Sequence, residues 1–547
     1  MLTGGRAGDG IKQAGNSIAR LFNRLGYWIF VYEDYPSLIR GGHNFAIVRA
    51  ASDRILAHRD AVDVMIALNQ ETYDRHKWRL KKDSIVIYDR PKVKAEGLGL
   101  PLSEIAKNKG LPDIVRNTAS LGALARVIGV DSSVVDDVIR SSISRNVEEN
   151  LAVAREGYAG ATDYAGAMEV EQINNEPKPL LNGNEVLGLG AVKAGLKLCV
   201  TYPMTPTSGI LHYLSENAER LGITVVQPEN EIGGIGMVEG GAYAGVRTMI
   251  ATSGGGFDLM VEHLSLAGQA EIPLVVVLGQ RPGPSTGVPT HTAQADLLYA
   301  IFSGHGEFPK IVMAPGDAEE AYRLSGEALN LAWKFQIPVI LMSDKHLSES
   351  TFSFDVDEDS VKEEPVVRWD GGGDYRRYAF TESGVSPLAF PGTGGVVVKC
   401  TSYEHDEFGI TTEEPELIKR DHDKRLRKEK SIEDELRSRQ TVRTYGPSDA
   451  KHIIVTWGSN KGACVEVANG RGMGVVQPLY LHPLPTWELS GKLASADKVI
   501  CVEANSKGQL ATWLRYHGMR VDNTVLKYDG RPFTVEELDR RVSEVLQ

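Results

Sequence analysis

The chain has 547 residues, of which 42% are apolar, 24% charged and 7% aromatic, with 57 glycines and 25 prolines. At roughly 150 residues per domain this length predicts three or four domains and excludes a small disulfide-stabilised scaffold. The composition is typical of a folded protein rather than a disordered one. The formal charge is −12, from 60 Lys and Arg against 72 Asp and Glu, so we expect neither nucleic acid nor an anionic membrane as a partner.

The apolar runs are strand-sized and fall short of the roughly 18 residues that a membrane span requires, so we expect no transmembrane helix. Residues 1–10 lack the basic start and apolar stretch of a secretory signal, which predicts a cytoplasmic protein. The four cysteines, Cys199, Cys400, Cys464 and Cys501, form no CxxC pair. We therefore expect any zinc or iron–sulfur cluster to lie on another chain.

Residues 1–145 read as one α/β domain. A glycine-rich turn at 4–10 precedes apolar residues at helical spacing over 11–25, and no strand is recognisable before that turn. Strand-like segments follow at 45–48, 62–68 and 84–88, and a further apolar-periodic region covers 118–138. Residues 146–182 change to Glu, Asn, Ala and Gly and end in Asn174-Asn-Glu-Pro-Lys-Pro179, which predicts a partly helical linker.

Residues 183–345 alternate predicted strands and helices, with Asp317 as the expected cap of a helix over 318–334. This alternation predicts a parallel sheet with helices on both faces. Residues 346–447 are rich in glycine and contain a charged run at 419–430, which favours loops and a solvated helix. Residues 448–547 return to the α/β pattern and predict a third, smaller domain.

Two glycine-rich segments leave both a ligand-binding and a purely structural interpretation open. The turn at 4–10 could hold a phosphate at a helix N-terminus or could be an ordinary tight turn. Gly8-Asp-Gly10 resembles the start of a thiamine diphosphate metal site, but the asparagines that should follow are missing, so we expect no metal on this chain. Ser253-Gly-Gly-Gly256 predicts a strand-to-helix turn at a sheet's carboxyl edge, where α/β sheets bind ligands.

Two further clusters carry the candidate site residues. In Thr201–Gly209 the prolines stiffen a loop that presents hydroxyls at the start of a helix, which favours an anion-binding loop over simple capping. Its candidate ligands are Tyr202, Pro203, Thr205 and Thr207. In Pro228–Gly236, Glu229 and Glu231 precede a glycine-rich helix; by themselves they could serve only the helix dipole.

A long Pro/Gly loop at 280–292 favours an active-site loop, because ordering such a segment costs entropy. It carries Arg281, which could clamp a carboxylate, and His291. His263, His291 and His305 show no metal-ligand spacing.

Together these motifs resemble the α subunit of 2-oxoacid:ferredoxin oxidoreductases, closest to the 2-oxoglutarate type. The resemblance is carried by Tyr202–Ser208, Glu229-Asn-Glu231, Thr252–Met260, Gln280–Gly287 and Gly304–Pro309. Residues 1–145, with Ile39-Arg-Gly-Gly-His43, are similar to the family's γ domain. Residues 450–547, with Pro483-Leu-Pro485 and Glu503–Gln509, resemble its transketolase C-terminal-like domain.

The resemblance implies an α/β multidomain fold: a γ-type domain, a doubly wound domain that binds the thiamine diphosphate pyrimidine, and the C-terminal-like domain. It implies a β subunit, in an (αβ)₂ assembly, that holds the diphosphate, Mg²⁺ and a [4Fe-4S] cluster. It also implies ferredoxin as electron acceptor and coenzyme A as cosubstrate, in contact with residues 1–145.

The same resemblance assigns roles to residues. A buried glutamate at the aminopyrimidine N1′ promotes loss of the cofactor's C2 proton; we assign this role to Glu231, with Glu229 second. Thr205 matches the position that holds the substrate. Relatives often carry Arg or Lys at the position of His291, but this sequence has a histidine there, so Arg281 is our preferred cation. Ser253 and Gly254 are expected at the cofactor.

Two alternatives remain open. One is an enzyme for pyruvate or branched-chain oxoacids. The other is a non-catalytic subunit that only binds CoA or a nucleotide.

Overall fold

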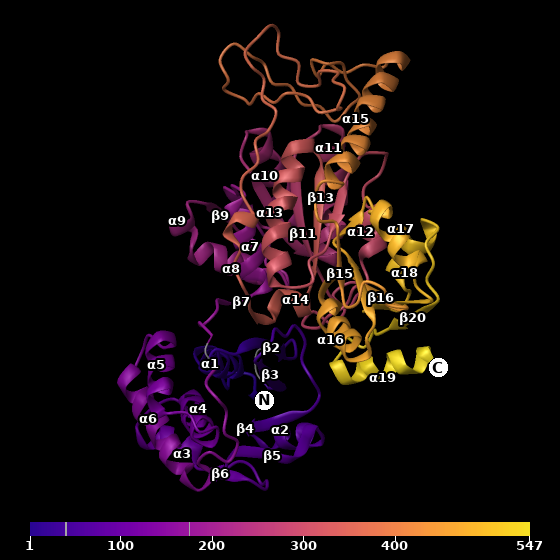
Figure 1. Cartoon of the computed structure of the whole chain (residues 1–547). Helices are drawn as coiled ribbons and strands as arrows, with labels where there is room; N and C mark the ends of the chain where they lie inside the picture. Colours follow the sequence, from indigo (N-terminus) through magenta and orange to yellow (C-terminus); the bar gives the residue numbers. More distant parts are fainter. Residues whose placement is uncertain (39–40, 174) are drawn as a thin grey trace. The chain divides into compact units, whose positions relative to one another are not determined.

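The computed structural model describes residues 1–38, 41–173 and 175–547. It divides into two compact units (Figure 1): Met1–Leu181 with Ser350–Asp355 and Thr534–Arg540, and Asn182–Glu349 with Val356–Phe533 and Arg541–Gln547. Ile39 and Arg40 of the γ-like motif, and Asn174 of the expected linker, lie outside the described residues. No helix in the described ranges is both long and apolar enough to cross a bilayer.

The first unit is built on an eight-stranded mixed sheet in the order β6-β5-β4-β1-β3-β2-β14-β7. Its strands are β1 (Leu2–Arg6), β2 (Trp28–Asp34), β3 (His43–Ala51), β4 (Val62–Ala67), β5 (Leu80–Asp89), β6 (Leu98–Leu100), β7 (Leu180–Asn182) and β14 (Thr351–Ser353). The unit therefore has the predicted α/β character. One expectation was wrong: β1 precedes the glycine turn and includes Gly4 and Gly5, whose neighbours Thr72 and Asp9 leave no room for a larger residue.

Six helices accompany this sheet: α1 (Ile11–Arg24), α2 (Gln70–His76), α3 (Leu102–Asn108), α4 (Arg116–Val127), α5 (Ser132–Ser142) and α6 (Val147–Gly160). Helix α6 lies in the segment that we expected to be a linker, and it packs tightly on α4. A Cβ at Gly122 would lie 2.0 Å from the Ala154 carbonyl oxygen, and one at Gly157 would lie 2.0 Å from that of Ala119. These glycines let the two backbones touch, so the first unit continues to Leu181 instead of ending at 145.

The second unit contains a seven-stranded sheet in the order β18-β12-β13-β11-β10-β8-β9, parallel except for β18. Its strands are β8 (Leu198–Val200), β9 (Thr224–Val226), β10 (Thr248–Ser253), β11 (Leu274–Gln280), β12 (Ile311–Met313), β13 (Pro338–Asp344) and β18 (Tyr480–His482). This is the predicted doubly wound domain, and its central strand β11 is buried along its whole length.

The helices of this domain are α7 (Gly183–Lys193), α8 (Ser208–Glu216), α9 (Ala218–Leu221), α10 (Glu231–Tyr243), α11 (Gly254–Gln269), α12 (Leu297–Phe302), α13 (Ala318–Phe335) and α14 (Lys345–Glu349). Asp317 caps α13 as predicted, because its carboxylate accepts the Glu320 N–H at 2.9 Å. The turn predicted at 253–256 is absent. The helix starts directly at Gly254, so all three glycines form its first turn.

A five-stranded sheet in the order β15-β17-β16-β19-β20 forms the predicted C-terminal domain. Its elements are β15 (Val442–Tyr445), β16 (His452–Thr456), β17 (Gly474–Pro478), β19 (Lys498–Glu503), β20 (Asn523–Leu526), α16 (Lys461–Arg471), α17 (Thr486–Ala494) and α18 (Gln509–Tyr516). Helix α19 (Val535–Leu546) follows them, and its residues up to Arg540 are grouped with the first unit. Strand β18 leaves this region to pair with β12 of the larger sheet, which joins the two domains.

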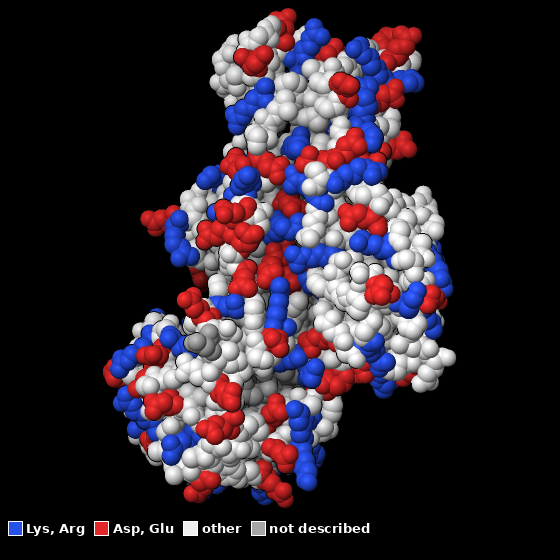
Figure 2. Space-filling model, viewed as in Figure 1, with Lys and Arg blue, Asp and Glu red and all other residues white. Residues whose placement is uncertain are grey.

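The charged run at 419–430 belongs to α15 (Pro415–Leu436), and our expectation of a merely solvated helix was wrong. Figure 2 shows acidic and basic side chains mixed over the face that it draws, but Lys424 and Lys428 are fully buried. Their Nζ atoms lie 2.5 Å from the two carboxylate oxygens of Glu271. Burial alone would raise the pKa of Glu271, but the two ammonium groups outweigh it and hold that pKa well below its ordinary range.

Candidate active site

The predicted site residues gather at one edge of the seven-stranded sheet. Strand β8 pairs with β9 on one side and with β10 on the other. The connections that leave the adjacent strands β8 and β10 therefore run toward opposite edges of the sheet. Ligands of doubly wound sheets bind at such a switch point, beyond the carboxyl ends of the strands. The loop 201–207 follows β8, Ser253 ends β10, and Arg281 follows β11.

Glu231 is the first residue of α10 and is only 4% exposed, whereas Glu229 lies outside the helix and is exposed. Asn230 caps the helix by accepting the Gly233 N–H at 2.9 Å, which fixes where Glu231 enters it. The Glu231 carboxylate lies against Gly256 of α11: a Cβ there would be 2.6 Å from Glu231 Oε1. That oxygen is buried without a hydrogen-bond partner among the described residues. A buried carboxylate oxygen of this kind calls for a donor from a ligand.

The loop 201–207 is stiff, and several of its polar groups are hydrogen-bonded by the protein itself. Asn184 Nδ2 donates to the Pro206 carbonyl at 2.8 Å, and the buried Thr207 hydroxyl donates to the Met204 carbonyl at 3.0 Å. The Thr207 hydroxyl is therefore hydrogen-bonded inside the loop itself. Tyr202 and Thr205 are half-buried and Pro203 is exposed, so these three remain accessible.

Arg281 connects the second loop to the first. Its guanidinium donates to the Thr205 carbonyl at 2.7 Å, and partial burial lowers its pKa while leaving it a cation. Its remaining N–H groups have no partner within the described ranges. His291 is half-buried at the other end of the loop, with Nδ1 3.1 Å from the Thr290 hydroxyl. The structure thus places Arg281, our preferred cation, against the main chain of Thr205.

Ser253 and Gly254 lie at the start of α11, where the sequence pattern placed a ligand. The Ser253 hydroxyl is buried and has no partner in the described part of the chain. A Cβ at Gly254 would lie 3.4 Å from Asp296 Oδ2. Burial, with Asp258 as a nearby like charge, raises the pKa of Asp296 to about 6. Sequence reasoning missed Asp296, because a lone aspartate after a loop carries no distinguishing pattern.

A second buried pair lies between α10 and α11, two turns beyond Glu231. His263 Nδ1 is 2.6 Å from Glu239 Oε2, and burial raises the pKa of Glu239 to about 7 against the opposing effect of His263. No sequence signal marked this pair, since its members are 24 residues apart on different helices.

Among the described residues, one group has the close spacing of acid and His side chains that could hold a metal: Glu271, His405 and Asp421 at α15. Its carboxylates already pair with Lys424, Lys428 and Arg425, so a cation would compete with three fixed charges.

Comparisons with known proteins show which class of protein the chain belongs to. Residues 1–160 match the pyruvate ferredoxin/flavodoxin oxidoreductase family, and residues 189–424 match the thiamine diphosphate-binding family of pyruvate flavodoxin/ferredoxin oxidoreductases. Both matches are to oxidoreductase families, and the second is to a thiamine diphosphate-binding domain.

Relatives narrow this assignment. The α subunit of 2-oxoacid:ferredoxin oxidoreductase 2 from Aeropyrum pernix is 32% identical, over 100% of this chain and 97% of its own length. The KorA subunit of 2-oxoglutarate oxidoreductase from Mycobacterium tuberculosis is 29% identical, over 99% and 90%. The structure of 2-oxoglutarate:ferredoxin oxidoreductase from Magnetococcus marinus matches with a TM-score of 0.91 at 32% identity, over 100% of this chain and 99% of that one. The chain belongs to the 2-oxoacid:ferredoxin oxidoreductase α-subunit family.

Proposed function

We propose that the chain is the α subunit of an enzyme that converts 2-oxoglutarate and coenzyme A to succinyl-CoA and CO₂, with ferredoxin as electron acceptor, in either direction. The observation that carries the proposal is the buried Oε1 of Glu231 at the switch point, which has no hydrogen-bond partner among the residues that the structure describes. The Magnetococcus marinus structure contains 2-oxoglutarate, coenzyme A and succinyl-CoA, which supports this choice of substrate.

The residues at this edge fit thiamine diphosphate. Glu231 would accept a hydrogen bond from the pyrimidine ring, and Ser253 offers a second buried group without a partner in the described ranges. The glycines that begin α11 leave room for a flat ring beside the carboxylate. When bound, the cofactor supplies the carbanion chemistry that decarboxylation of a 2-oxoacid needs. The Glu231 carboxylate would hold a proton at the ring nitrogen. The protein that encloses Glu231 would exclude water from this position.

The substrate would lie between the loops 201–207 and 281–291. The Thr205 hydroxyl and the guanidinium of Arg281 suit the carboxylate and carbonyl oxygens of an oxoacid, and Tyr202 would border them. His291 would stand near the distal carboxylate of 2-oxoglutarate. A comparison of 2-oxoglutarate, pyruvate and branched-chain oxoacids in one assay tests this choice.

An apolar surface beside Glu231 supports a partner subunit. Ile232 and Met237 of α10 and Leu259 of α11 are 50%, 48% and 49% exposed. We propose that the β subunit covers this surface in an (αβ)₂ complex and provides the diphosphate site, Mg²⁺ and a [4Fe-4S] cluster. Apolar side chains exposed next to a cofactor site are typical of a subunit interface.

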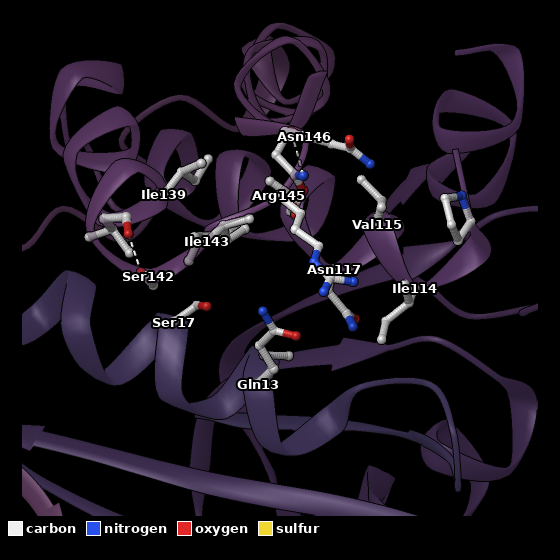
Figure 3. A pocket seen from close by; sticks show the side chains of 16 residues that line it. Gln13, Ser17, Ile114, Val115, Asn117, Ile139, Ser142, Ile143, Arg145 and Asn146 are labelled. Atoms are coloured by element: carbon white, nitrogen blue, oxygen red, sulfur yellow. Dashed lines mark hydrogen bonds between the residues drawn. The ribbon is translucent and has the colours of Figure 1, made fainter. Parts of the chain in front are cut away.

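Coenzyme A would contact the first unit at a cavity of about 510 Å³. Figure 3 shows Arg145 extending into this cavity near Asn117, with Gln13 and Ser17 of α1 on the facing wall. Arg145 has no ion-pair partner among the described residues, and Asn117 Oδ1 is buried without a hydrogen-bond partner there. The floor is apolar, with Leu121, Val138 and Ile139. A planar base over this floor and a phosphate at Arg145 would satisfy both groups.

The central test replaces Glu231 by Ala and by Gln in the chain purified with its partner subunit. We expect assembly to be unchanged and oxoacid-dependent electron transfer to be abolished in both variants. Retained activity in Glu231→Ala would remove the residue from the chemistry. For the CoA cavity, Arg145→Ala should raise the KM for CoA and leave the KM for the oxoacid unchanged. Arg140→Ala, which breaks only the exposed pair with Glu148, is the matched control.

A further inference from the structure

The loop 281–291 is fixed by its ends rather than by its middle. Residues 283–288 are exposed. The loop closes on itself where Val288 N–H donates to the Pro282 carbonyl at 3.0 Å. Gly287 is required for this closure, because a Cβ there would lie 1.7 Å from that carbonyl oxygen. The position of His291 must therefore be set by the chain that enters the loop and the chain that leaves it.

The chain that leaves the loop is bound to the C-terminal domain through Gln294. Gln294 is fully buried; its N–H donates to the Ala504 carbonyl at 2.7 Å and its Oε1 accepts the Ala504 N–H at 3.1 Å. Its carbonyl accepts Asn505 Nδ2 at 3.0 Å, and its Nε2 donates to the Trp457 carbonyl at 2.9 Å. Hydrogen bonds to a buried polar side chain specify one position, because losing any of them leaves an unpaired group.

The next residues are held by Gln509, the first residue of α18. Its Nε2 donates to the Ala295 carbonyl at 2.5 Å, and its Oε1 accepts the Leu298 N–H at 2.9 Å. Upstream, the Thr292 N–H donates to the Gly530 carbonyl at 3.1 Å, and Gly530 lies directly against the His291 side chain. Three segments of the C-terminal region thus bond to residues 292–298.

The segment that carries Ala504, Asn505 and Gln509 is itself rigid. Glu503 is fully buried, and its carboxylate accepts the N–H groups of Leu510 at 2.8 Å and Ala511 at 3.0 Å at the start of α18. The same carboxylate accepts Asn505 Nδ2 at 2.8 Å. A helix N-terminus stabilises a buried carboxylate without a basic partner. Glu503–Gln509, a motif to which the proposed function gives no role, is therefore built as a fixed support.

We propose that the turn Glu503–Gln509 and Gln294 are positioning residues that hold the oxoacid-binding loop 281–291 in place. The inference rests on the proposed function of that loop. It explains why the C-terminal domain, which contributes no group to the chemistry at Glu231, carries a motif with so many buried polar contacts. A displacement of residues 292–298 would act first on His291, which directly precedes them, whereas Glu231 belongs to a different loop and helix.

The test uses Gln509→Ala in the chain assembled with its partner subunit. Gln509 is half-buried, so its truncation removes two hydrogen bonds to the main chain without opening a core. We expect the KM for the oxoacid to rise roughly tenfold and kcat to change by less than about twofold, because the loop acts in binding. Amide hydrogen exchange in 283–290 should become faster. Gln509→Glu, which keeps the acceptor for Leu298, should give an intermediate KM.

Thr512→Ala is the matched control, since Thr512 is exposed on the same helix and, within the described part of the chain, its side chain makes no hydrogen bond to residues 292–298. It should change neither exchange nor KM. Unchanged exchange in Gln509→Ala would overturn the anchoring role of the turn. Faster exchange with an unchanged KM would overturn the proposal through its other premise, that the loop binds the oxoacid. The same result would leave the role of Glu231 in catalysis untouched.

Discussion

Gly256→Ala tests the placement of the Glu231 carboxylate without changing any charge. The added Cβ would lie 2.1 Å from Thr252 Oγ1 and 2.6 Å from Glu231 Oε1. A relaxed carbon–oxygen contact is about 3.3 Å, so the carboxylate has to move by about 0.7 Å. A misplacement near 1 Å costs on the order of 100-fold in rate, or about 2.7 kcal/mol in the barrier.

The assay is CoA-dependent reduction of a one-electron acceptor by the assembled enzyme, together with the bound thiamine diphosphate and the melting temperature. We expect Gly256→Ala to assemble, to melt somewhat lower than wild type because the Cβ also crowds the buried Thr252, and to lose kcat/KM by on the order of 100-fold. Gly470→Ala on α16, where an added Cβ meets nothing within 4 Å, is the helix-glycine control and should be fully active. A fully active Gly256→Ala enzyme would refute the requirement for this carboxylate position.

Three further predictions concern other parts of the second unit. Glu271→Gln leaves Lys424 and Lys428 buried without a counter-charge and should lower the free energy of unfolding by about 3–5 kcal/mol, seen in calorimetry as a lower melting temperature. Because the pKa of Glu271 is lowered in the folded protein, this loss of stability should persist from pH 7 to 5. A variant that melts like wild type would contradict the role of the cluster. Glu239 has a pKa raised from 4.5 to about 7, so the folded protein keeps a proton that the unfolded chain releases in that interval, and stability falls as pH rises through it; in Glu239→Gln this slope of melting temperature against pH should be smaller. Arg281→Lys loses the planar fork and should raise the KM for the oxoacid by roughly tenfold in steady-state assays, whereas an unchanged KM would remove Arg281 from the substrate site.

The difference in burial between Glu229 and Glu231 follows from the sequence around them. Asn230 is a good helix cap, so the residue after it must enter the helix and turn toward the sheet, whereas the residue before it stays outside. The conformation of the glycines at 254–256 was harder to predict, because glycine disfavours a helix and a turn is the local preference. The fold overrides that preference, since Glu231 occupies the space that a side chain at 256 would need.

The buried charges of α15 could not be predicted from the chain alone. A run of alternating acids and bases is usually a solvated face, and nothing local shows that Glu271, 153 residues away from Lys424, faces them inside the protein. Helix α6 shows the same limitation. Its composition resembles a linker, and packing against other helices, closest at Gly122 of α4, makes it part of a core. In both cases the deciding interaction is long-range, whereas periodicity and composition report local preference.

In the proposed function, chemistry and substrate choice fall to separate elements at the switch point. Glu231 is buried at the start of α10, and its position depends on Asn230 and Gly256. His291 lies on a loop whose middle is exposed and whose far end is fixed by the C-terminal domain. A change at the loop therefore alters the groups that meet the distal part of an oxoacid while the carboxylate that serves the cofactor stays in place. On the proposed function, this separation would let one scaffold accept different oxoacids by substitution in 283–291, because those residues make few contacts that the core requires.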